Sequence, residues 1–228
     1  MKFLALALLL GSLGLTQADA QAKPVVPDLS KITDSTSWKV IHADAEKIET
    51  EGRTVVRLVA EGDSANGIVG LALAHAPGFS TGTIEIDLKG KNLKQRSFLG
   101  VAFNVVNEKT FEAVYFRPFN FKAEDPIRNR SVQYIAWPTN TWEHLRKTAP
   151  GQFEKPVNPV PDPDGWFHAA IEVTTHQVRV FVNHAKEPSL VVARLSSDSA
   201  ERPVGLFFDS ADGEYANFSV APLGFPSR

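Results

Sequence analysis

The stretch "AAIEVTTHQVRVFVN", residues 169–183, contains two short runs in which apolar and polar side chains alternate. Ile171 and Val173 share one face of the first run, and Val178, Val180 and Val182 share one face of the second. A period of two residues is typical of a β-strand with one buried face, and the polar "TTH" between the runs favours a turn. The stretch therefore predicts an antiparallel hairpin that contributes one face to a core.

Segments of the same kind occur along most of the chain, bounded by Gly, Pro, Asn and Asp. In "TIEIDLKG", residues 83–90, apolar side chains again alternate with polar ones. We predict strands at about 38–42, 53–60, 66–75, 82–89, 97–106, 110–118, 131–137, 166–174, 177–183, 189–195, 203–208 and 214–220. Many short strands without a long helical period indicate an all-β sandwich.

The N-terminal stretch "MKFLALALLLGSLGLTQADA", residues 1–20, has the features of a secretory signal peptide: a lysine, an apolar run and small residues at the cleavage site. We expect cleavage near Ala20 and a secreted or periplasmic protein without membrane insertion, since the apolar run is too short for a span. The expected organisation is a leader over 21–29, one sandwich domain over 30–222 and a tail over 223–228. The chain has no Cys, which excludes disulfides and a lipid-anchored cysteine.

The formal net charge is −2, with acidic and basic residues interspersed. Without a basic run, nucleic acid and anionic membrane surfaces are poor partners, and the balance favours an uncharged partner. The histidines are scattered and match no metal-binding motif, so no metal ligands are predicted among them. We expect a monomer.

The segment 138–165, "PTNTWEHLRKTAPGQFEKPVNPVPDPDG", is a long proline-rich connection. Connections of this length within a compact domain are uncommon and are either functional or disordered. Because disordered segments are poor in aromatic residues, Trp142 and Phe153 favour an ordered loop that packs on the sandwich.

Several stretches together resemble the concanavalin A-like superfamily, the jelly-roll sandwich of legume lectins, laminin G-like domains and several glycoside-acting enzymes. They are "FSTGTIEIDLKGKN", "FLGVAFN", "GWFHAAIEVTTHQVRVFVN" followed by "PSLVVARL", and "RPVGLFFDSADGEYANFSV". Within this frame, the "FEAVYFRPFNF" region is similar to a subgroup of uncharacterised secreted bacterial proteins distantly related to the 3-keto-disaccharide hydrolase domain. The resemblance covers nearly all of 30–221. It implies a two-sheet antiparallel jelly roll whose ligands lie on a concave sheet face or at its rim, with strands near 97–137 forming that face.

Two of these strands, 97–106 and 110–118, carry polar side chains opposite an apolar set. The apolar set of the first strand is Leu99, Val101, Phe103 and Val105. If this set packs between the sheets, then Asn104, Tyr115 and Arg117 point outward onto the concave face. Gln133, on the next predicted strand, could join them.

Such a group suits a carbohydrate, because sugars offer neutral hydroxyls and an apolar C–H face to amide and guanidinium donors beside an aromatic ring. Trp137 and Trp142 could add stacking surface, and we include His144 among the candidate ligand-binding residues. The alternatives are that Arg117 is a packed surface arginine beside Tyr115 and that Trp137 belongs to the core.

Arg128 and Arg130 follow two acidic residues in "EDPIRNRS". Exposed ion pairs within this loop would contribute at most about 1 kcal/mol each. Alternatively, one arginine reaches the concave face and holds a carboxylate or a sugar hydroxyl. We assign the structural role to Arg128 and the ligand-binding role to Arg130.

Evidence for catalysis is sparser. The "EID" at residues 85–87 is similar to the ExDxxE motif of family-16 glycoside hydrolases, but Gly90 stands at the last acidic position, so an exposed polar strand face is the better interpretation. Glu112 opens a strand of the predicted concave sheet and is the candidate catalytic base, with His144 or Tyr115 nearby. A 3-keto-glycoside chemistry could also use a metal to stabilise an enolate, but no set of ligands for it is recognisable.

Calcium is the one cofactor that the sequence suggests. Asp209 and Asp212 with Gly213 could hold a Ca²⁺ ion at the rim, although a plain Asp-Gly turn explains the same residues.

The leading hypothesis is a secreted lectin-like domain that binds an oligo- or polysaccharide on its concave face without cleaving it. The first alternative is a glycoside-acting hydrolase or lyase of the 3-keto-disaccharide hydrolase or glucanase type, with Glu112 as its base. The second is an adhesive or structural module that binds protein, which filling of the groove by segment 138–165 would favour.

Overall fold

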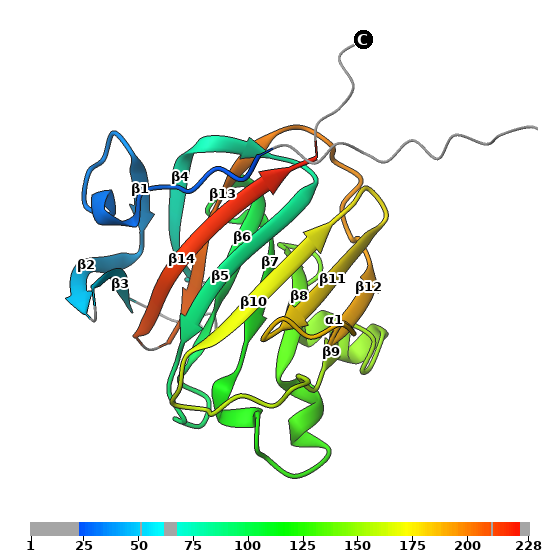
Figure 1. Cartoon of the computed structure of the whole chain (residues 1–228). Coiled ribbons are helices and arrows are strands. Elements are labelled where there is room, and N and C mark those ends of the chain that lie inside the picture. Colours follow the sequence, from blue (N-terminus) through cyan, green and yellow to red (C-terminus); the bar gives the residue numbers. More distant parts are fainter. Residues whose placement is uncertain (1–22, 51, 62–67, 211, 224–228) are drawn as a thin grey trace, which may run out of the picture.

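The computed structural model describes residues 23–50, 52–61, 68–210 and 212–223. The expected signal peptide with Ala20, the first two residues of the leader and the tail from residue 224 lie outside these ranges. Within them the chain forms two antiparallel sheets packed face to face, which confirms the all-β, jelly-roll sandwich class (Figure 1). No helix in the described part of the chain is long and apolar enough to cross a membrane.

The first sheet carries the candidate site. Its strands, in spatial order, are β1 (Trp38–Ile41), β4 (Gly70–Phe79), β13 (Arg202–Asp209), β6 (Phe98–Asn107), β7 (Thr110–Phe116), β8 (Val132–Trp137) and β9 (Glu154–Lys155). Neighbouring β6 and β7 pair through a tight connection in which Asn107 is the partner of Thr110. Strands distant in sequence, such as β13 and β6, thus lie side by side.

The second sheet lies in front of the first in Figure 1. Its order is β12 (Leu190–Ala193), β11 (Gln177–Val182), β10 (Phe167–Val173), β5 (Gly82–Lys89), β14 (Gly213–Pro222), β3 (Arg53–Ala60) and β2 (Ala43–Thr50). The hairpin predicted at residues 169–183 is β10 and β11, with Ile171 opposite Val180 and Val173 opposite Val178.

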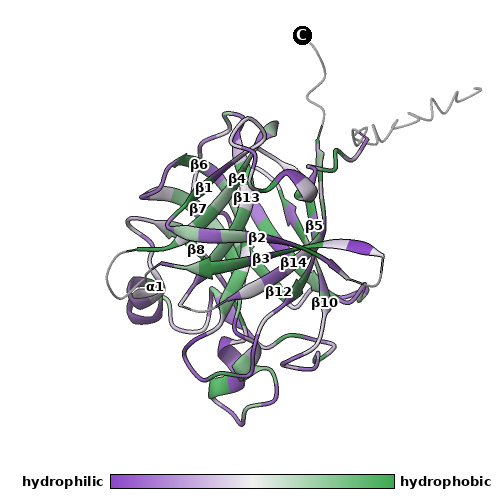
Figure 2. Cartoon of the chain, turned by 90° about the vertical axis from the view of Figure 1, so that its left-hand side faces the viewer, coloured by the Kyte–Doolittle hydropathy of each residue, from purple (hydrophilic) through white to green (hydrophobic). Residues whose placement is uncertain are grey.

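Alternation along the strands builds the core between the sheets. In β5, Ile84, Ile86 and Leu88 are fully buried while Glu85 is exposed. Burying one such aliphatic side chain contributes roughly 1.5–3 kcal/mol. Figure 2 shows this division, with hydrophobic residues along the strands and hydrophilic residues gathered in the connections and in α1 (Trp142–Thr148).

The alternation of β6 is interrupted at Asn104, so the four apolar residues expected on one face of this strand do not all share it. Asn104 has a positive φ of 49°, and the β6–β7 register shifts after Phe103. This extra residue in the strand reverses the side-chain directions beyond it, as in a β-bulge. Val105 therefore packs on the outer face of the sheet instead of between the sheets.

The structure contains three elements that were not expected, namely β2, α1 and β9. Strand β2 has polar and charged residues on both faces and lies at a sheet edge, so it lacks the alternation that marks the other strands. Segment 138–165 is ordered, as Trp142 and Phe153 indicated, but it contains the helix α1 and the short strand β9. Thr141 caps α1, accepting a hydrogen bond from the backbone N–H of His144 at 3.3 Å.

Three short 3-10 turns complete the described chain: η1 (Leu29–Lys31), η3 (Pro118–Asn120) and η4 (Ile127–Arg130). The last two lie between β7 and β8 and form one wall of the site described next.

Candidate functional site

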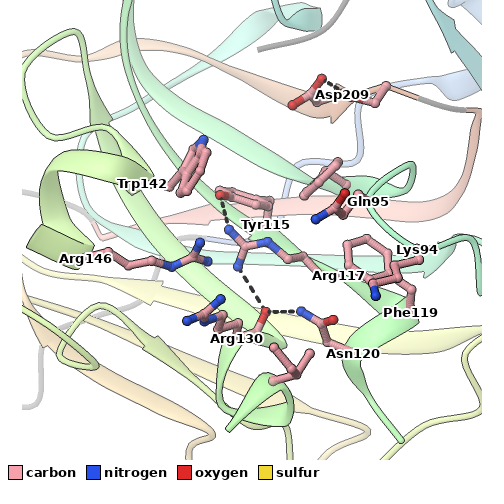
Figure 3. Close-up of a pocket in the computed structure, with 13 residues that line it drawn as sticks. Lys94, Gln95, Tyr115, Arg117, Phe119, Asn120, Arg130, Trp142, Arg146 and Asp209 are labelled. Atoms are coloured by element: carbon pink, nitrogen blue, oxygen red, sulfur yellow. Dashed lines mark hydrogen bonds between the residues drawn. The ribbon is translucent and has the colours of Figure 1, made fainter. Parts of the chain in front are cut away.

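A cavity of about 360 Å³ opens at one end of the outer face of the first sheet, where β7 and β13 end and β6 begins (Figure 3). Its walls come from the connection before β6, from η3 and η4, and from α1. The aromatic lining is Phe98, Tyr115, Phe119 and Trp142, and the basic lining is Lys94, Arg117, Arg130 and Arg146. The volume lies within the range of small-molecule sites, which begins at about 300 Å³.

The strand register places a row of side chains along the sheet beside this cavity. Phe207, Gly100, Tyr115, Gln133 and Glu154 are Cα partners in turn across β13, β6, β7, β8 and β9. Across Gly100 the rings of Phe207 and Tyr115 approach to 5.2 Å between centroids. A Cβ on Gly100 would lie 2.1 Å from a carbonyl oxygen of β7, so only glycine fits there.

Arg117 directly follows β7 and is buried, with 4 % of its surface exposed. Its guanidinium donates hydrogen bonds to Tyr115 Oη at 2.7 Å, Gln133 Oε1 at 2.5 Å and the carbonyl oxygen of Arg130 at 3.0 Å. It also lies 4.8 Å from the centre of the Tyr115 ring and 5.7 Å from that of Phe98. Burial lowers the pKa of this guanidinium. The arginine is thus neither solvated nor a simple surface residue, because fixed partners hold it within the site.

Glu154 is the carboxylate that three arginines share. Arg146 binds it closely, with N–O distances of 3.0, 3.0 and 2.8 Å. Arg117 and Arg130 stand farther off, with N–O distances of 3.8 and 3.7 Å. Since β9 pairs with β8, Glu154 anchors α1 to the sheet through Arg146 and places all three guanidinium groups near the cavity.

The aromatic side of the cavity is built from residues of β6, β7, η3 and α1. Trp142 is the first residue of α1, and the Arg146 guanidinium lies over its ring at 4.7 Å. Phe98 and Phe119 meet edge to face, with centroids 5.4 Å apart. Such contacts hold the rings in place while Trp142 remains partly exposed.

Tyr115 is a hydrogen-bonding group here and is not poised as a base. Burial raises its pKa to about 12, although the Arg117 and Arg146 charges oppose this rise. Its hydroxyl donates to Gln133 Oε1 at 3.3 Å while accepting from Arg117.

Four of the residues predicted to bind a ligand line this one cavity: Tyr115, Arg117, Arg130 and Trp142. Gln133 is fully buried beside them, where it orients Arg117 without lining the cavity. Neighbouring strands thus bring Tyr115, Gln133 and the adjoining Arg117 together as predicted, and the role of all these residues in binding stays a prediction.

Asn104 and Glu112 were misplaced by the sequence reasoning. Because of its positive φ, Asn104 turns inward and donates a hydrogen bond to Glu112 Oε1 at 2.7 Å. Glu112 shares the inner face of β7 with Val114 and Phe116, on the side opposite Tyr115.

The contacts of Glu112 are those of a core residue. Its carboxylate pairs with Arg194 at 3.0 Å and accepts a short hydrogen bond from the hydroxyl of Tyr134. The side chains of Glu112 and Arg194 are each 2 % exposed. A carboxylate held in this way between the sheets cannot reach a ligand in the cavity, so the structure contradicts the expected position of a catalytic base near Tyr115 or His144.

His144 and Trp137 also lie elsewhere. His144 is exposed on α1 and does not line the cavity. Trp137 stacks on Phe111, with centroids 5.5 Å apart, and packs with the apolar cluster of the outer face, in keeping with the core alternative.

The loop arginines separate as expected. Arg128 forms an exposed ion pair with Asp125 at 3.1 Å, which is the local role assigned to it. Arg130 instead reaches the cavity.

The suggested calcium pair does not come together. Asp209 lines the cavity, whereas the Asp212 carboxylate is bound by Arg57 at 2.7 Å and Lys91 at 2.5 Å in a separate hollow. Burial alone would raise the pKa of Asp212, but the hydrogen bonds from Lys91 and Arg57 outweigh it and hold the pKa below its usual value. Over the described ranges, no group of three acidic, His or Cys side chains is arranged to hold a metal.

In the "EID" stretch, Glu85 and Asp87 lie on the outer face of the second sheet, remote from the cavity, while Ile86 packs in the core. Asp87 is engaged there by His168 at 2.9 Å and Asn217 at 2.6 Å. This agrees with its interpretation as a polar strand face.

Four residues of the site were not predicted from the sequence: Phe98, Phe119, Arg146 and Glu154. Arg146 had a usable signal, because "TWEHLRK" begins with an N-cap residue and places basic residues in the last turn of a short helix. Glu154 had none, since its importance comes from the pairing of β9 with β8.

The middle of the outer face is not an open groove. Leu71, Ala102, Ala113 and Ile135 form a buried apolar cluster there. Segment 138–165 contributes Leu145 to this cluster, which shifts the accessible region to the rim, where the cavity lies.

Comparisons with known proteins bear on the fold. No family model matches the chain, and no curated protein sequence matches it. The chain is similar in structure to the carbohydrate binding module CBM66 from Bacillus subtilis, with 12% identity, a TM-score of 0.51, and coverage of 80% of this chain and 93% of that one. It is also similar to a Bacillus subtilis protein of unknown function with a galectin-like fold, with 13% identity, a TM-score of 0.50, and coverage of 89% and 96%. At these identities the likeness supports the jelly-roll fold.

Proposed function

We propose that the protein binds a glycan in the rim cavity and does not cleave it. The observation that carries this proposal is the meeting of Tyr115 and the partly exposed Trp142 with Arg117 and Arg130 around one opening (Figure 3). A sugar ring presents an apolar C–H face that suits an aromatic side chain, and hydroxyls that suit guanidinium donors. The arginines are held by Tyr115, Gln133 and Glu154, so much of the site is preorganised.

The fold is compatible with this function. One similar structure is described as a carbohydrate binding module, and it shares the architecture on which the cavity is built. Fold alone does not determine function, so the weight of the proposal stays on the side chains of the cavity. The signal-like N-terminus further suggests a secreted or periplasmic protein, which would meet polysaccharides outside the cytoplasm.

The carboxylates near the cavity support binding over hydrolysis. A glycosidase of the common type needs two carboxyl groups, one as acid and one as nucleophile or base. Among the described residues that line the cavity, Asp209 is the only acid. Glu154 lies behind the arginines of the cavity and is bound by Arg146. Glu112 lies between the sheets.

A protein-binding module remains the alternative for the rest of the outer face. Segment 138–165 partly fills the middle of this face, which favours the alternative, but the cavity beside α1 stays open. The open cavity favours a small ligand over a flat protein surface.

The test is a glycan array followed by calorimetry with the purified chain and with Trp142→Ala. We expect binding to at least one glycan class and loss of most of that affinity in Trp142→Ala. Trp166→Ala is the matched control, because Trp166 stacks with Arg53 outside the cavity and its loss should leave binding intact.

Two results would contradict the proposal. One is an absence of binding across neutral, acidic and sulfated glycans. The other is release of shortened sugars from any bound glycan, which would favour the enzymatic alternative.

A further inference from the structure

The cavity holds more positive than negative charge. Lys94, Arg117, Arg130 and Arg146 line it, while Asp209 is the only acid among its described lining residues and Glu154 stands just behind the arginines. Counting these groups leaves an excess of two positive charges, although the whole chain carries a net charge of −2. The overall balance that favoured an uncharged partner therefore hides a local basic site.

This excess is concentrated at one end of the cavity. Figure 3 shows Arg117, Arg130 and Arg146 gathered on one side of Tyr115, with Asp209 on the other side. Because Coulomb attraction weakens with distance, Asp209 neutralises the charge of the three arginines only in part.

Glu154 satisfies only one of the three arginines by hydrogen bonding. Arg146 takes both carboxylate oxygens at 2.8–3.0 Å. The nearest nitrogens of Arg117 and Arg130 are at 3.8 and 3.7 Å, which is beyond hydrogen-bonding distance. Arg130 also keeps 39 % of its side chain exposed, so it can present its guanidinium to a ligand.

Resting on the proposed glycan binding, we infer that the ligand is acidic: a glycan with a uronic acid unit whose carboxylate is bound at Arg130, beside the buried Arg117. A planar carboxylate matches the planar fork of a guanidinium through two parallel hydrogen bonds. The same sugar ring would then lie towards Trp142, which lines the cavity close to the arginines. The requirement for an anion and for a ring face together select an acidic sugar over a small free anion.

The experiment compares glycans that share a backbone and differ in whether their carboxyl groups are charged or methyl-esterified. Oligogalacturonate and its methyl ester of equal length have the same backbone, and the ester removes the carboxylate charge. Matched acid and ester pairs of oligoglucuronate and of alginate oligomers extend the comparison to other uronic acids. A sulfated galactan oligosaccharide without uronic acid distinguishes carboxylate recognition from general attraction of anions.

We expect at least one uronate oligomer to bind about tenfold or more tightly than its ester, as one charge-assisted fork contact implies. This preference should shrink as salt is added, because the Arg130 end is partly exposed and screened. Arg130→Gln should bring the acid and the ester close to equal affinity. Arg128→Gln is the matched control, since Arg128 pairs with Asp125 outside the cavity, and it should keep the full preference.

Equal binding of acid and ester for every pair would overturn this inference while leaving the glycan-binding proposal intact. So would binding of the sulfated galactan with no binding of any uronate, or an acid preference that survives Arg130→Gln unchanged. Failure of the proposed function gives a different pattern, in which the acids, the esters, neutral glycans and the sulfated glycan all fail to bind the folded protein.

Discussion

Replacing Glu112 by glutamine separates a structural carboxylate from a catalytic one. Glu112 and Arg194 pair at 3.0 Å between the sheets, each with 2 % of its side chain exposed. Glutamine keeps the shape but removes the negative charge, which leaves the Arg194 charge buried without compensation. Removing one partner of a buried ion pair costs about 3–5 kcal/mol.

The surroundings of the pair support the upper part of that range. Arg194 also donates to the carbonyl oxygens of Ser80 at 3.1 Å and Thr174 at 3.3 Å, so it is fixed and cannot move easily to water. Asn104 and Tyr134 would lose an ionised acceptor in the same substitution. The free energy of unfolding of a domain is usually about 5–15 kcal/mol, so the expected loss is a large fraction of the total stability.

The assay is equilibrium unfolding in urea, followed by tryptophan fluorescence. We expect Glu112→Gln to shift the midpoint strongly without changing the denaturant slope. Glu85→Gln, on an exposed position of β5, is the control and should change the free energy of unfolding by less than about 0.5 kcal/mol. The double substitution Glu112→Gln with Arg194→Met should cost less than the sum of the single ones, because it removes both charges. A Glu112→Gln protein as stable as the wild type would refute this reasoning.

Three further perturbations test other parts of the structure. Gly100→Ala places a Cβ 2.1 Å from the carbonyl oxygen of Val114. We therefore expect the free energy of unfolding to fall by on the order of 2 kcal/mol or more in the same assay. A fall below about 0.5 kcal/mol would contradict the close approach of β6 and β7. Burial alone would raise the pKa of Asp212, but the hydrogen bonds from Lys91 and Arg57 outweigh it and hold the pKa below its usual value of 3.8. The contribution of Asp212 to stability is therefore present above pH 3.8 and is lost as the pH falls through the folded-state pKa. Unfolding free energies measured against pH should thus show a shallower acid loss in Asp212→Asn, and identical curves would count against the ion pairs. Burial raises the pKa of Tyr115 from 10.0 to about 12, so its contribution is present below pH 10 and is lost as the pH rises towards 12. Tyr115→Phe should therefore flatten the alkaline loss of stability, and an unchanged alkaline limb would argue that this hydroxyl is not buried.

Much of the fold could be predicted because its strands have one buried face. Ile84, Ile86 and Leu88 show this directly, since each alternates with a polar residue and each is fully buried. Strand β2 could not be recognised in the same way, because an edge strand with polar residues on both faces carries no period-two signal.

The site was predictable in part for the same reason. Alternation places Tyr115 and Gln133 on one side of neighbouring strands, and Arg117 follows on that side. The inward direction of the Asn104 side chain could not be predicted, because it depends on a positive φ that the alternation of side chains does not reveal. The burial of Glu112 could not be predicted, because a charged residue is expected in a core only where a partner neutralises it. That partner, Arg194, is distant in sequence.

The most direct test of glycan binding at the rim is a crystal structure of the protein soaked with the glycan that binds best in solution. We expect sugar density in the cavity, with a ring beside Trp142 and its polar groups at Arg130. Density only at another surface, such as the outer face of the second sheet around Trp166, with the cavity unoccupied by sugar, would contradict it.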